Sequence, residues 1–208
     1  MIDPNLKSAL KSSYDVKAQE RESLTIEGWK EKERDVFLSF LVNEDVKSLL
    51  EVGAGPGKDS LYFSSKGLLT MSVDLSPEMV ELCKSKGLNA REMSFDHLDF
   101  SDSSYESIWA MNCLLHVPKK DLEDTLLEIK RVLKPSGLFF MGVYGGENSE
   151  GIWEDDFYEP KRFFSFYTDE DLKIILENHF KIEYFVVVPA ETVGGKYHFQ
   201  SWVLRKKG

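Results

Sequence analysis

An apolar strand that runs into a glycine-rich turn and then a helix is the feature that most limits how this 208-residue chain can fold. The segment at residues 49–60 reads Leu-Leu-Glu-Val-Gly-Ala-Gly-Pro-Gly-Lys-Asp-Ser. Strand–turn–helix units of this kind build α/β folds, and glycines in the turn let the backbone come close to a ligand at the strand end. The segment therefore predicts a nucleoside-binding turn in a parallel sheet.

Two residues of this segment indicate which nucleoside it binds. A dinucleotide-binding turn has a third glycine where this chain has Lys58. Glu51, just before the turn, would repel a pyrophosphate held at a helix N-terminus. The same carboxylate suits a ligand that carries an amino group and hydroxyls, and S-adenosylmethionine is such a ligand.

A second strand-like segment, residues 69–74, ends in Asp74, about 20 residues beyond the first glycine. A carboxylate at that point can accept hydrogen bonds from both ribose hydroxyls. Asp74 also precedes a helix that Ser76 and Pro77 are suited to start, so a purely structural role is compatible with the same pattern.

From about Val46 to Val143 the chain resembles the class I, Rossmann-like S-adenosylmethionine-dependent methyltransferases. The glycine-rich segment resembles the first motif of that family, and Asp74 its ribose-binding acid. Residues 94–96 resemble the adenine-contacting stretch. Residues 107–112 with 115–118 resemble the fourth motif, and residues 131–138 the entry into the fifth strand.

The resemblance implies S-adenosylmethionine as the cofactor, S-adenosylhomocysteine as its product, and no metal. The two cysteines, Cys83 and Cys113, have no metal-ligand spacing either. The cofactor contacts that we expect are Tyr14, Glu51, Gly53, Ala54, Gly55, Gly57, Asp74, Leu75, Met79, Ser94, Phe95, Asp96 and Asn112.

Periodicity predicts the fold class from the residues themselves. Strand-like segments at 46–52, 69–74, 88–94, 107–112 and 137–143 alternate with helix-like ones, the clearest at 119–133. Two further strands, 180–188 and 198–204, are too close in sequence for a helical crossover and must be antiparallel. We therefore predict an α/β fold: a doubly wound, mostly parallel seven-stranded sheet with an antiparallel last strand and helices on both faces.

Length and composition predict one domain over residues 1–208. We divide it into an N-terminal helical lid (1–45), a cofactor-binding core (46–143), an acceptor-loop insertion (144–167) and a C-terminal helix with a strand pair (168–208). The net charge of −10 disfavours nucleic acid as a partner. Without a long apolar run or a signal-like amino terminus, we expect a cytoplasmic protein that avoids membranes and is a monomer or a homodimer.

The acceptor site is the least determined part. The insertion carries the predicted substrate contacts Tyr144, Trp153, Arg162 and Tyr167, although its aromatic residues could equally form a local apolar cluster. Tyr14 is the expected lid residue, with ordinary helix packing as the alternative. His116 follows the fourth strand and is the candidate general base, with a structural role as the alternative.

The sequence thus favours a methyltransferase that transfers a methyl group from S-adenosylmethionine to an O, N or S atom of a small molecule. Three alternatives remain open at this point: a protein methyltransferase, an NAD-dependent oxidoreductase, and a non-catalytic cofactor-binding module.

Overall fold

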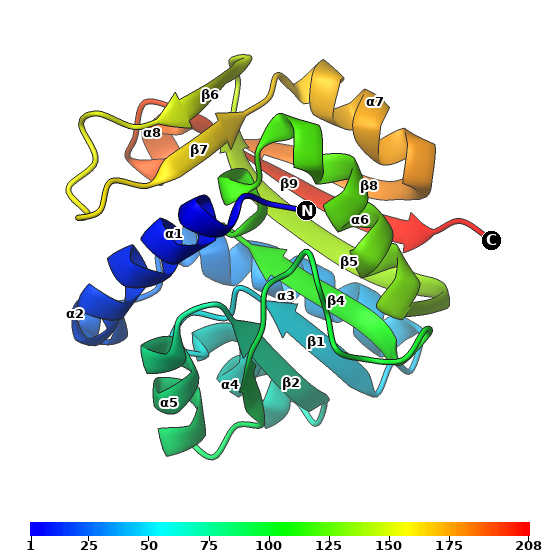
Figure 1. Ribbon diagram of the computed structural model, residues 1–208. Helices are drawn as coiled ribbons and strands as arrows, with labels where there is room; N and C mark the ends of the chain where they lie inside the picture. Colours follow the sequence, from blue (N-terminus) through cyan, green and yellow to red (C-terminus); the bar gives the residue numbers. More distant parts are fainter.

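The computed structural model describes residues 1–208, and its centre is the predicted seven-stranded sheet (Figure 1). The strands of the sheet follow the order β3-β2-β1-β4-β5-β9-β8. Their bounds are β1 Ser48–Val52, β2 Leu69–Asp74, β3 Ala90–Glu92, β4 Tyr105–Met111, β5 Leu133–Gly145, β8 Phe180–Val188 and β9 His198–Lys206. Two short strands, β6 Ser149–Ile152 and β7 Phe163–Phe166, pair with each other in a separate hairpin.

The direction of the strands confirms the predicted fold class. Strands β3, β2, β1, β4 and β5 pair in parallel, whereas β9 pairs antiparallel with both of its neighbours. The last strand of the chain, β9, lies between β5 and β8, and β8 forms the edge of the sheet.

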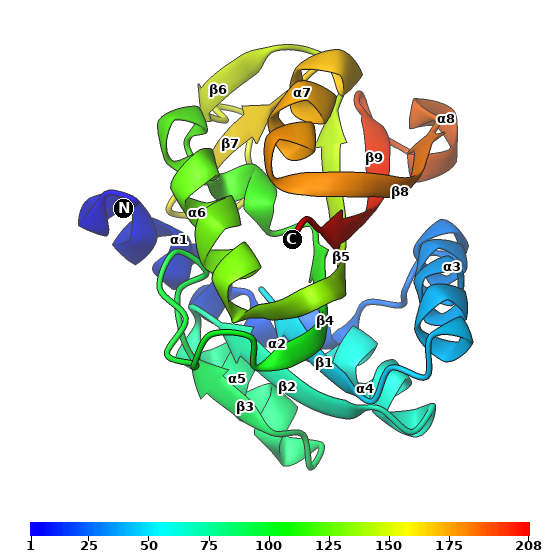
Figure 2. The same cartoon turned by 90° about the vertical axis from the view of Figure 1, so that its right-hand side faces the viewer.

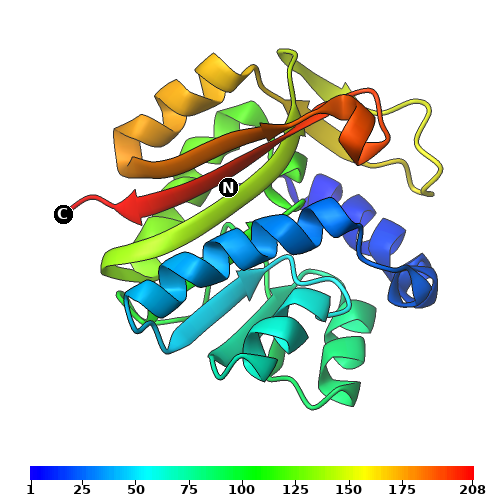
Figure 3. The same ribbon diagram turned by 180° about the vertical axis from the view of Figure 1, so that it is seen from behind.

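The helices lie on both faces of the sheet, as predicted (Figures 1 and 3). Their bounds are α1 Pro4–Val16, α2 Ala18–Ser23, α3 Gly28–Asn43, α4 Lys58–Ser65, α5 Pro77–Ser85, α6 Lys119–Val132, α7 Asp169–His179 and α8 Ala190–Val193, with a short 3₁₀ turn, η1, at Leu114–His116. No helix here combines the length and the apolar character that a membrane-spanning helix needs.

Alternation along the buried strands sends neighbouring residues to opposite cores. Leu50 in β1 packs into the larger core beneath α6 and α7, and its neighbour Leu49 packs beneath α3 and α4. The apolar face of α6, within the predicted helix at 119–133, has Leu122, Leu126 and Ile129 fully buried. Full burial of each such side chain contributes about 1.5–3 kcal/mol.

Two strand boundaries differ from the sequence expectation. The third strand is shorter than 88–94: it pairs with β2 only over Ala90–Glu92, and the Met93 amide makes the last hydrogen bond of this ladder, to the carbonyl of Asp74. The fifth strand starts at Leu133 rather than 137, directly after α6, with an irregular register opposite Tyr105.

The insertion at 144–167 has its own secondary structure, the β6–β7 hairpin, which projects beyond the sheet on the side of α1 (Figures 1 and 2). The helix after it begins as predicted, because the Thr168 hydroxyl accepts a hydrogen bond from the Asp171 amide at 3.1 Å. The hairpin and α1 contact each other through residues that are far apart in sequence, which encloses the strand ends between them.

Candidate active site

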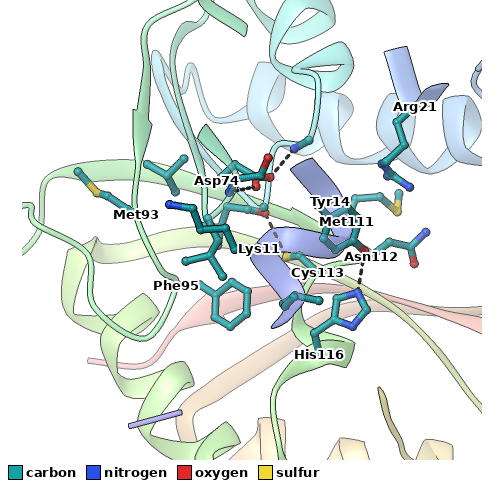
Figure 4. A pocket seen from close by; sticks show the side chains of 17 residues that line it. Lys11, Tyr14, Arg21, Asp74, Met93, Phe95, Met111, Asn112, Cys113 and His116 are labelled. Carbon is teal, nitrogen blue, oxygen red and sulfur yellow. Dashed lines mark hydrogen bonds between the residues drawn. The ribbon is translucent and has the colours of Figure 1, made fainter. Parts of the chain in front are cut away.

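Two adjoining cavities lie at the carboxyl ends of β1, β2 and β4, beneath α1 and α2. Figure 4 shows the first of them. The volumes of the two cavities are about 50 and 160 Å³. Residues common to both walls are Arg21, Gly53, Gly55, Met111 and Asn112. Ligands of open α/β sheets bind at this edge, so the cavities form one candidate cleft.

Asp74 lies in the wall of the first cavity, at the end of β2. Its Oδ2 accepts from the Gly55 amide at 2.7 Å and its Oδ1 from the Ser76 amide at 2.9 Å. Burial raises the pKa of Asp74 above its ordinary value, while these two amides oppose the rise. Each oxygen keeps a second lone pair, so the carboxylate can still accept two hydroxyls. Leu75 lines the same cavity.

Glu51 lies in the wall of the second cavity, and its carboxylate also starts α4. Its Oε2 accepts from the amide of Ser60 at 2.8 Å and from the Ser60 hydroxyl. Because Gly57 provides no side chain to cap this helix, Glu51 satisfies the helix N-terminus from the preceding strand. Burial, chiefly, raises the pKa of Glu51 well above its ordinary range, and nearby Asp59 adds to the rise.

The three glycines of the turn have different roles. All three have positive φ angles, but only Gly55 would meet nothing with an added Cβ, because it opens to the cavities. A Cβ on Gly53 would lie 2.3 Å from that of Cys113, and one on Gly57 would lie 2.7 Å from the sulfur of Cys83. Gly57 therefore serves packing and does not line the cleft, whereas Ala54 lines the second cavity.

The predicted adenine stretch divides between the cleft and the lid. Phe95 lines the first cavity together with Met93, which the sequence reasoning did not include. Asp96 turns away: it forms an ion pair with Lys7 at 2.6 Å and accepts from the Ile2 amide at 3.0 Å. Ser94 donates to Asp96, so this pair anchors α1 and lines neither cavity. Met79, also predicted as a contact, is fully buried inside α5.

Tyr14, on α1, lies over the first cavity and meets His116 there (Figure 4). The Tyr14 Oη lies 2.8 Å from His116 Nε2, and Arg162 Nη1 donates to the same oxygen at 3.1 Å. His116 Nδ1 lies 2.7 Å from the carbonyl oxygen of Phe163. Since a carbonyl only accepts, Nδ1 carries the proton and Nε2 accepts from the Tyr14 hydroxyl.

This arrangement speaks against His116 as a free base. Its Nε2 already has a partner, and burial lowers its pKa to about 3. The imidazole is therefore neutral and links the lid to the β6–β7 hairpin.

Asn112 directly follows β4 and lines both cavities. Its φ is 57°, in the left-handed region that asparagine tolerates better than most residues. Its side-chain Oδ1 is buried without a hydrogen-bond partner. A buried acceptor without a partner costs about 1–3 kcal/mol, which a bound donor group can offset.

The four predicted substrate residues lie outside the cleft. Arg162 is bidentate on Asp156, at 2.8 and 2.9 Å, and binds Tyr14 with its remaining terminal nitrogen. Tyr144 packs on Trp29 beside Met111, without lining the cleft. Trp153 lines a separate shallow groove on the hairpin, and Tyr167 is buried in the larger core. None of the four lines either cavity.

Sequence reasoning missed the residues that the N-terminal segment brings to the cleft. Lys11 and Arg21 line the first cavity, and residues 24–27 line the second. The sequence analysis predicted a lid over residues 1–45 but did not single out any of these residues. No group of three or more His, Cys, Asp or Glu side chains in the structure could hold a metal ion.

Comparison with known proteins finds methyltransferases among the relatives of this chain. Residues 50–141 match a family model described as a methyltransferase domain. The methyltransferase GfsG of Streptomyces halstedii is 33% identical over 99 residues, which is 43% of this chain and 34% of that protein. The chain spans only 34%, 15% and 39% of the lengths of the first three curated relatives it matches.

Solved structures share the whole fold. The 1,6-didemethyltoxoflavin-N1-methyltransferase of Burkholderia thailandensis, described with its substrate and S-adenosylhomocysteine bound, superposes with a TM-score of 0.80 at 20% identity, over 100% of this chain and 92% of that one. The [4+2]-cyclase SpnF superposes with a TM-score of 0.63 at 18% identity, over 77% of this chain and 74% of that one. Residues 50–141 thus match a methyltransferase domain, and the sheet has the Rossmann-like fold of class I S-adenosylmethionine-dependent methyltransferases.

Proposed function

We propose that the protein binds S-adenosylmethionine in the paired cavities and transfers its methyl group to an O, N or S atom of a small-molecule acceptor. The observation that carries the proposal is the order of groups along the cleft. The apolar Phe95 and Met93 line the first cavity together with Asp74, the open glycine Gly55 lines both cavities, and Glu51 lines only the second. An adenine, a ribose and an amino-acid tail present their groups in the same order.

The helix N-terminus distinguishes this cofactor from NAD. A dinucleotide places its pyrophosphate on the free amides and positive end of the helix after the glycine-rich turn. Here the Glu51 carboxylate already accepts from the Ser60 amide at that helix end. A pyrophosphate would meet a negative charge there, whereas an ammonium group would meet a partner.

Methyl transfer places modest demands on the protein, because the sulfonium of the cofactor already makes the methyl carbon electrophilic. Alignment of the acceptor with the methyl–sulfur bond can supply about 7–11 kcal/mol of the barrier. The Oδ1 of Asn112 is buried and has no hydrogen-bond partner. In the cleft it is free to accept a hydrogen bond from the methyl acceptor and so to orient that molecule. His116 and Tyr14 serve in this proposal to hold the lid, and the reaction uses no base from this pair.

Enclosure favours a small acceptor over a protein. Helices α1 and α2 cover the cleft, and Ser13 on α1 donates to the carbonyl of Pro160 in the segment after β6. A protein substrate would need an open groove that leads to the strand ends. The enzyme from Burkholderia thailandensis is described as a 1,6-didemethyltoxoflavin-N1-methyltransferase, and 1,6-didemethyltoxoflavin therefore joins amines and phenols in the first acceptor screen.

A non-catalytic or non-methylating role is the remaining alternative, because one neighbour of the same fold is described as a cyclase. Calorimetric titration with S-adenosylmethionine, S-adenosylhomocysteine and NAD tests the cofactor. We expect saturable binding of the two adenosyl ligands and none of NAD; binding of NAD alone would refute the proposal. Transfer of a labelled methyl group to any member of the acceptor screen then separates an enzyme from a binding module.

A further inference from the structure

A separate groove lies on the β6–β7 hairpin, outside the cleft. Four aromatic side chains line it, and together they are called the aromatic corner here: Trp153, Phe164, Phe166 and Tyr197. The groove has a volume of about 200 Å³, which is larger than that of either cavity of the cleft. No residue of the groove lines either cavity. The groove is therefore available to a ligand of its own.

The strand pairing of the hairpin keeps this groove open. Side chains that are directly opposite in an antiparallel pair lie on the same face. Gly151 lies opposite Phe164, and a Cβ on this glycine would meet nothing within 4 Å. The next pair on the same face is Ser149 with Phe166. Two small residues thus lie opposite two rings, and the space beside the rings stays empty of side chains.

Trp153 lies across a row of three rings. The planes of Phe164 and Phe166 are 3° apart, and those of Phe166 and Tyr197 are 24° apart. The Trp153 ring makes angles of 79°, 81° and 78° with these three rings. Its main-chain amide donates to the carbonyl of Arg162 at 3.0 Å. This bond extends the hairpin ladder and holds the indole at the end of it.

Trp153 is the ring of the corner that is left for an external cation. The guanidinium carbon of Arg162 lies 5.1 Å from the ring centre of Phe164, and the Lys196 amine lies 4.6 Å from that of Tyr197. No Lys or Arg side chain lies over the Trp153 ring, which is 37% exposed. Among aromatic side chains, tryptophan is the best cation–π partner. The corner thus attracts positive charge while its strongest ring has no cation.

The charged residues that line the groove are both acids. Glu154 pairs with Lys161 at 3.1 Å. Glu150 forms no ion pair: its Oε2 accepts from the Lys119 amide at 2.9 Å and from the Ser165 hydroxyl at 3.3 Å. A carboxylate without a counter-ion beside an open indole suits a cation with an apolar surface. A methylated ammonium is such a cation, because its methyl groups contact the rings while it keeps its charge.

We propose that the aromatic corner binds a small organic cation with a methylated ammonium group. The rings contact the methyl groups, Trp153 supplies the cation–π interaction, and Glu150 provides the negative charge. Phe164 divides this site from the lid, because its ring centre lies 5.3 Å from that of Trp153 and 4.8 Å from that of His116. Binding here needs no cofactor and is independent of the proposed function.

Titration with choline and with dimethylbutanol, its neutral isostere in which carbon replaces the charged nitrogen, tests the site. The amide and indole N–H signals of residues 149–154, followed by NMR, report on the groove. We expect choline to shift these signals saturably. It should bind about 3- to 30-fold more tightly than the neutral alcohol, because only choline gains a cation–π interaction.

Two variants address the corner itself. Trp153→Leu keeps an apolar side chain and removes the ring, so it should weaken choline about 3- to 30-fold and the alcohol much less. Gly151→Val fills the open space opposite Phe164 and should abolish binding of both ligands, while valine suits a strand. Glu150→Gln should weaken choline a few-fold and leave the alcohol unchanged.

Phe157→Leu is the matched control. Phe157 is another exposed aromatic residue of the segment between the two strands, but it lies outside the groove and Lys17 already lies over its ring at 5.8 Å. This variant should change neither affinity. Thermal unfolding of each variant checks that the fold is retained. If Trp153→Leu does not fold, Gly151→Val still decides the location of the site.

Equal affinity of the wild-type protein for choline and the alcohol would overturn the cation site and leave an apolar groove. Absence of saturable shifts with either ligand would overturn it as well. Choline binding that survives unchanged in Gly151→Val, or that Phe157→Leu weakens as much as Trp153→Leu does, would show that the cation binds elsewhere on this surface.

Discussion

The two sides of the cleft are built in different ways. On the sheet side, the groups that face the ligand are fixed by partners nearby in sequence: Glu51 by Ser60, nine residues on, and Asp74 by Gly55, 19 residues back. On the lid side, the contacts join distant segments, as in Tyr14 with His116, 102 residues apart, and Arg21 with Tyr158, 137 apart. Short motifs can thus encode the cofactor side, whereas the lid and acceptor side exists only in the folded chain.

This difference has an energetic counterpart. The sheet-side groups bind main-chain amides within a rigid strand end, and their positions persist without the lid. The lid-side groups depend on long side chains that meet across three segments, so loosening one of them releases the others. Changes on the sheet side should therefore act mainly on affinity, and changes on the lid side mainly on stability and closure.

Asp74→Asn should cause the largest loss of cofactor affinity. Two ribose hydrogen bonds to a carboxylate, each worth about 1.5–3 kcal/mol, predict a loss of about 100-fold or more in calorimetric binding of S-adenosylhomocysteine. Asp96→Asn is the matched control: it makes the same change in the loop after β3, where the carboxylate holds Lys7 of the lid. This variant should lose only a few-fold in affinity for S-adenosylhomocysteine, and equal losses of affinity in the two variants would contradict the assignment of Asp74.

His116 should make the protein sensitive to acid. Its folded pKa of about 3 lies below its unfolded pKa of about 6.5, so the unfolded chain binds the proton between these values. Stability relative to a non-titrating variant should fall by about 1.4 kcal/mol per pH unit as pH drops below about 6.5, reaching about 3 kcal/mol near pH 4.5.

Urea unfolding of wild type and His116→Gln at pH 7.5, 5.5 and 4.5 measures this difference. Glutamine keeps one donor and one acceptor for Phe163 and Tyr14 but does not titrate in this range. Parallel pH profiles for the two proteins would mean that the lid contact on His116 is not formed in solution.

The contrast between the two sides also explains how far the sequence could be interpreted. Alternating apolar segments and turn residues predicted the sheet, its antiparallel last strand and the helix starts at Ser76 and Thr168, since each depends on local pattern. Asp74, Glu51 and Gly55 fall in the cleft for the same reason, although their contacts with a cofactor stay predictions.

The acceptor side could not be derived in this way. An aromatic and charged insertion gave no indication that Gly151 would pair with Phe164, which places Trp153 in a groove of the hairpin and not in the cleft. Arg21 lies in a polar run without a motif, and only the packing of α2 on the glycine-rich turn reveals it. Arg162 looked like a substrate contact because its partners, Asp156 and Tyr14, are known only from the fold.

Tyr14→Phe removes one hydroxyl from the lid and should cost about 1–3 kcal/mol of stability, because it leaves His116 Nε2 buried without a donor. We expect only a few-fold loss in cofactor affinity, in keeping with a lid-side change. Tyr62→Phe removes a hydroxyl that binds Asp35 at an exposed site and should cost less than about 0.5 kcal/mol. Urea unfolding at pH 7.5 compares the two, and equal losses would contradict a buried lid contact.

Lys58→Met is the smallest expected effect, and it tests the one residue that belongs to both sides. Lys58 occupies the position of the missing third glycine, and burial lowers the pKa of its amine while it donates to two carbonyls of the lid segment. Loss of these bonds should cost about 1 kcal/mol and weaken cofactor binding a few-fold, because α2 and Arg21 lose their anchor on α4. Lys66→Met, at the opposite end of the same helix and near Tyr62, should change neither quantity in parallel unfolding and calorimetric measurements. If Lys58→Met lowers cofactor affinity without lowering stability, Lys58 contacts the cofactor itself. If affinity and stability fall together, Lys58 attaches the lid to the glycine-rich turn. That attachment would then explain why this chain has a lysine where the dinucleotide pattern has its third glycine.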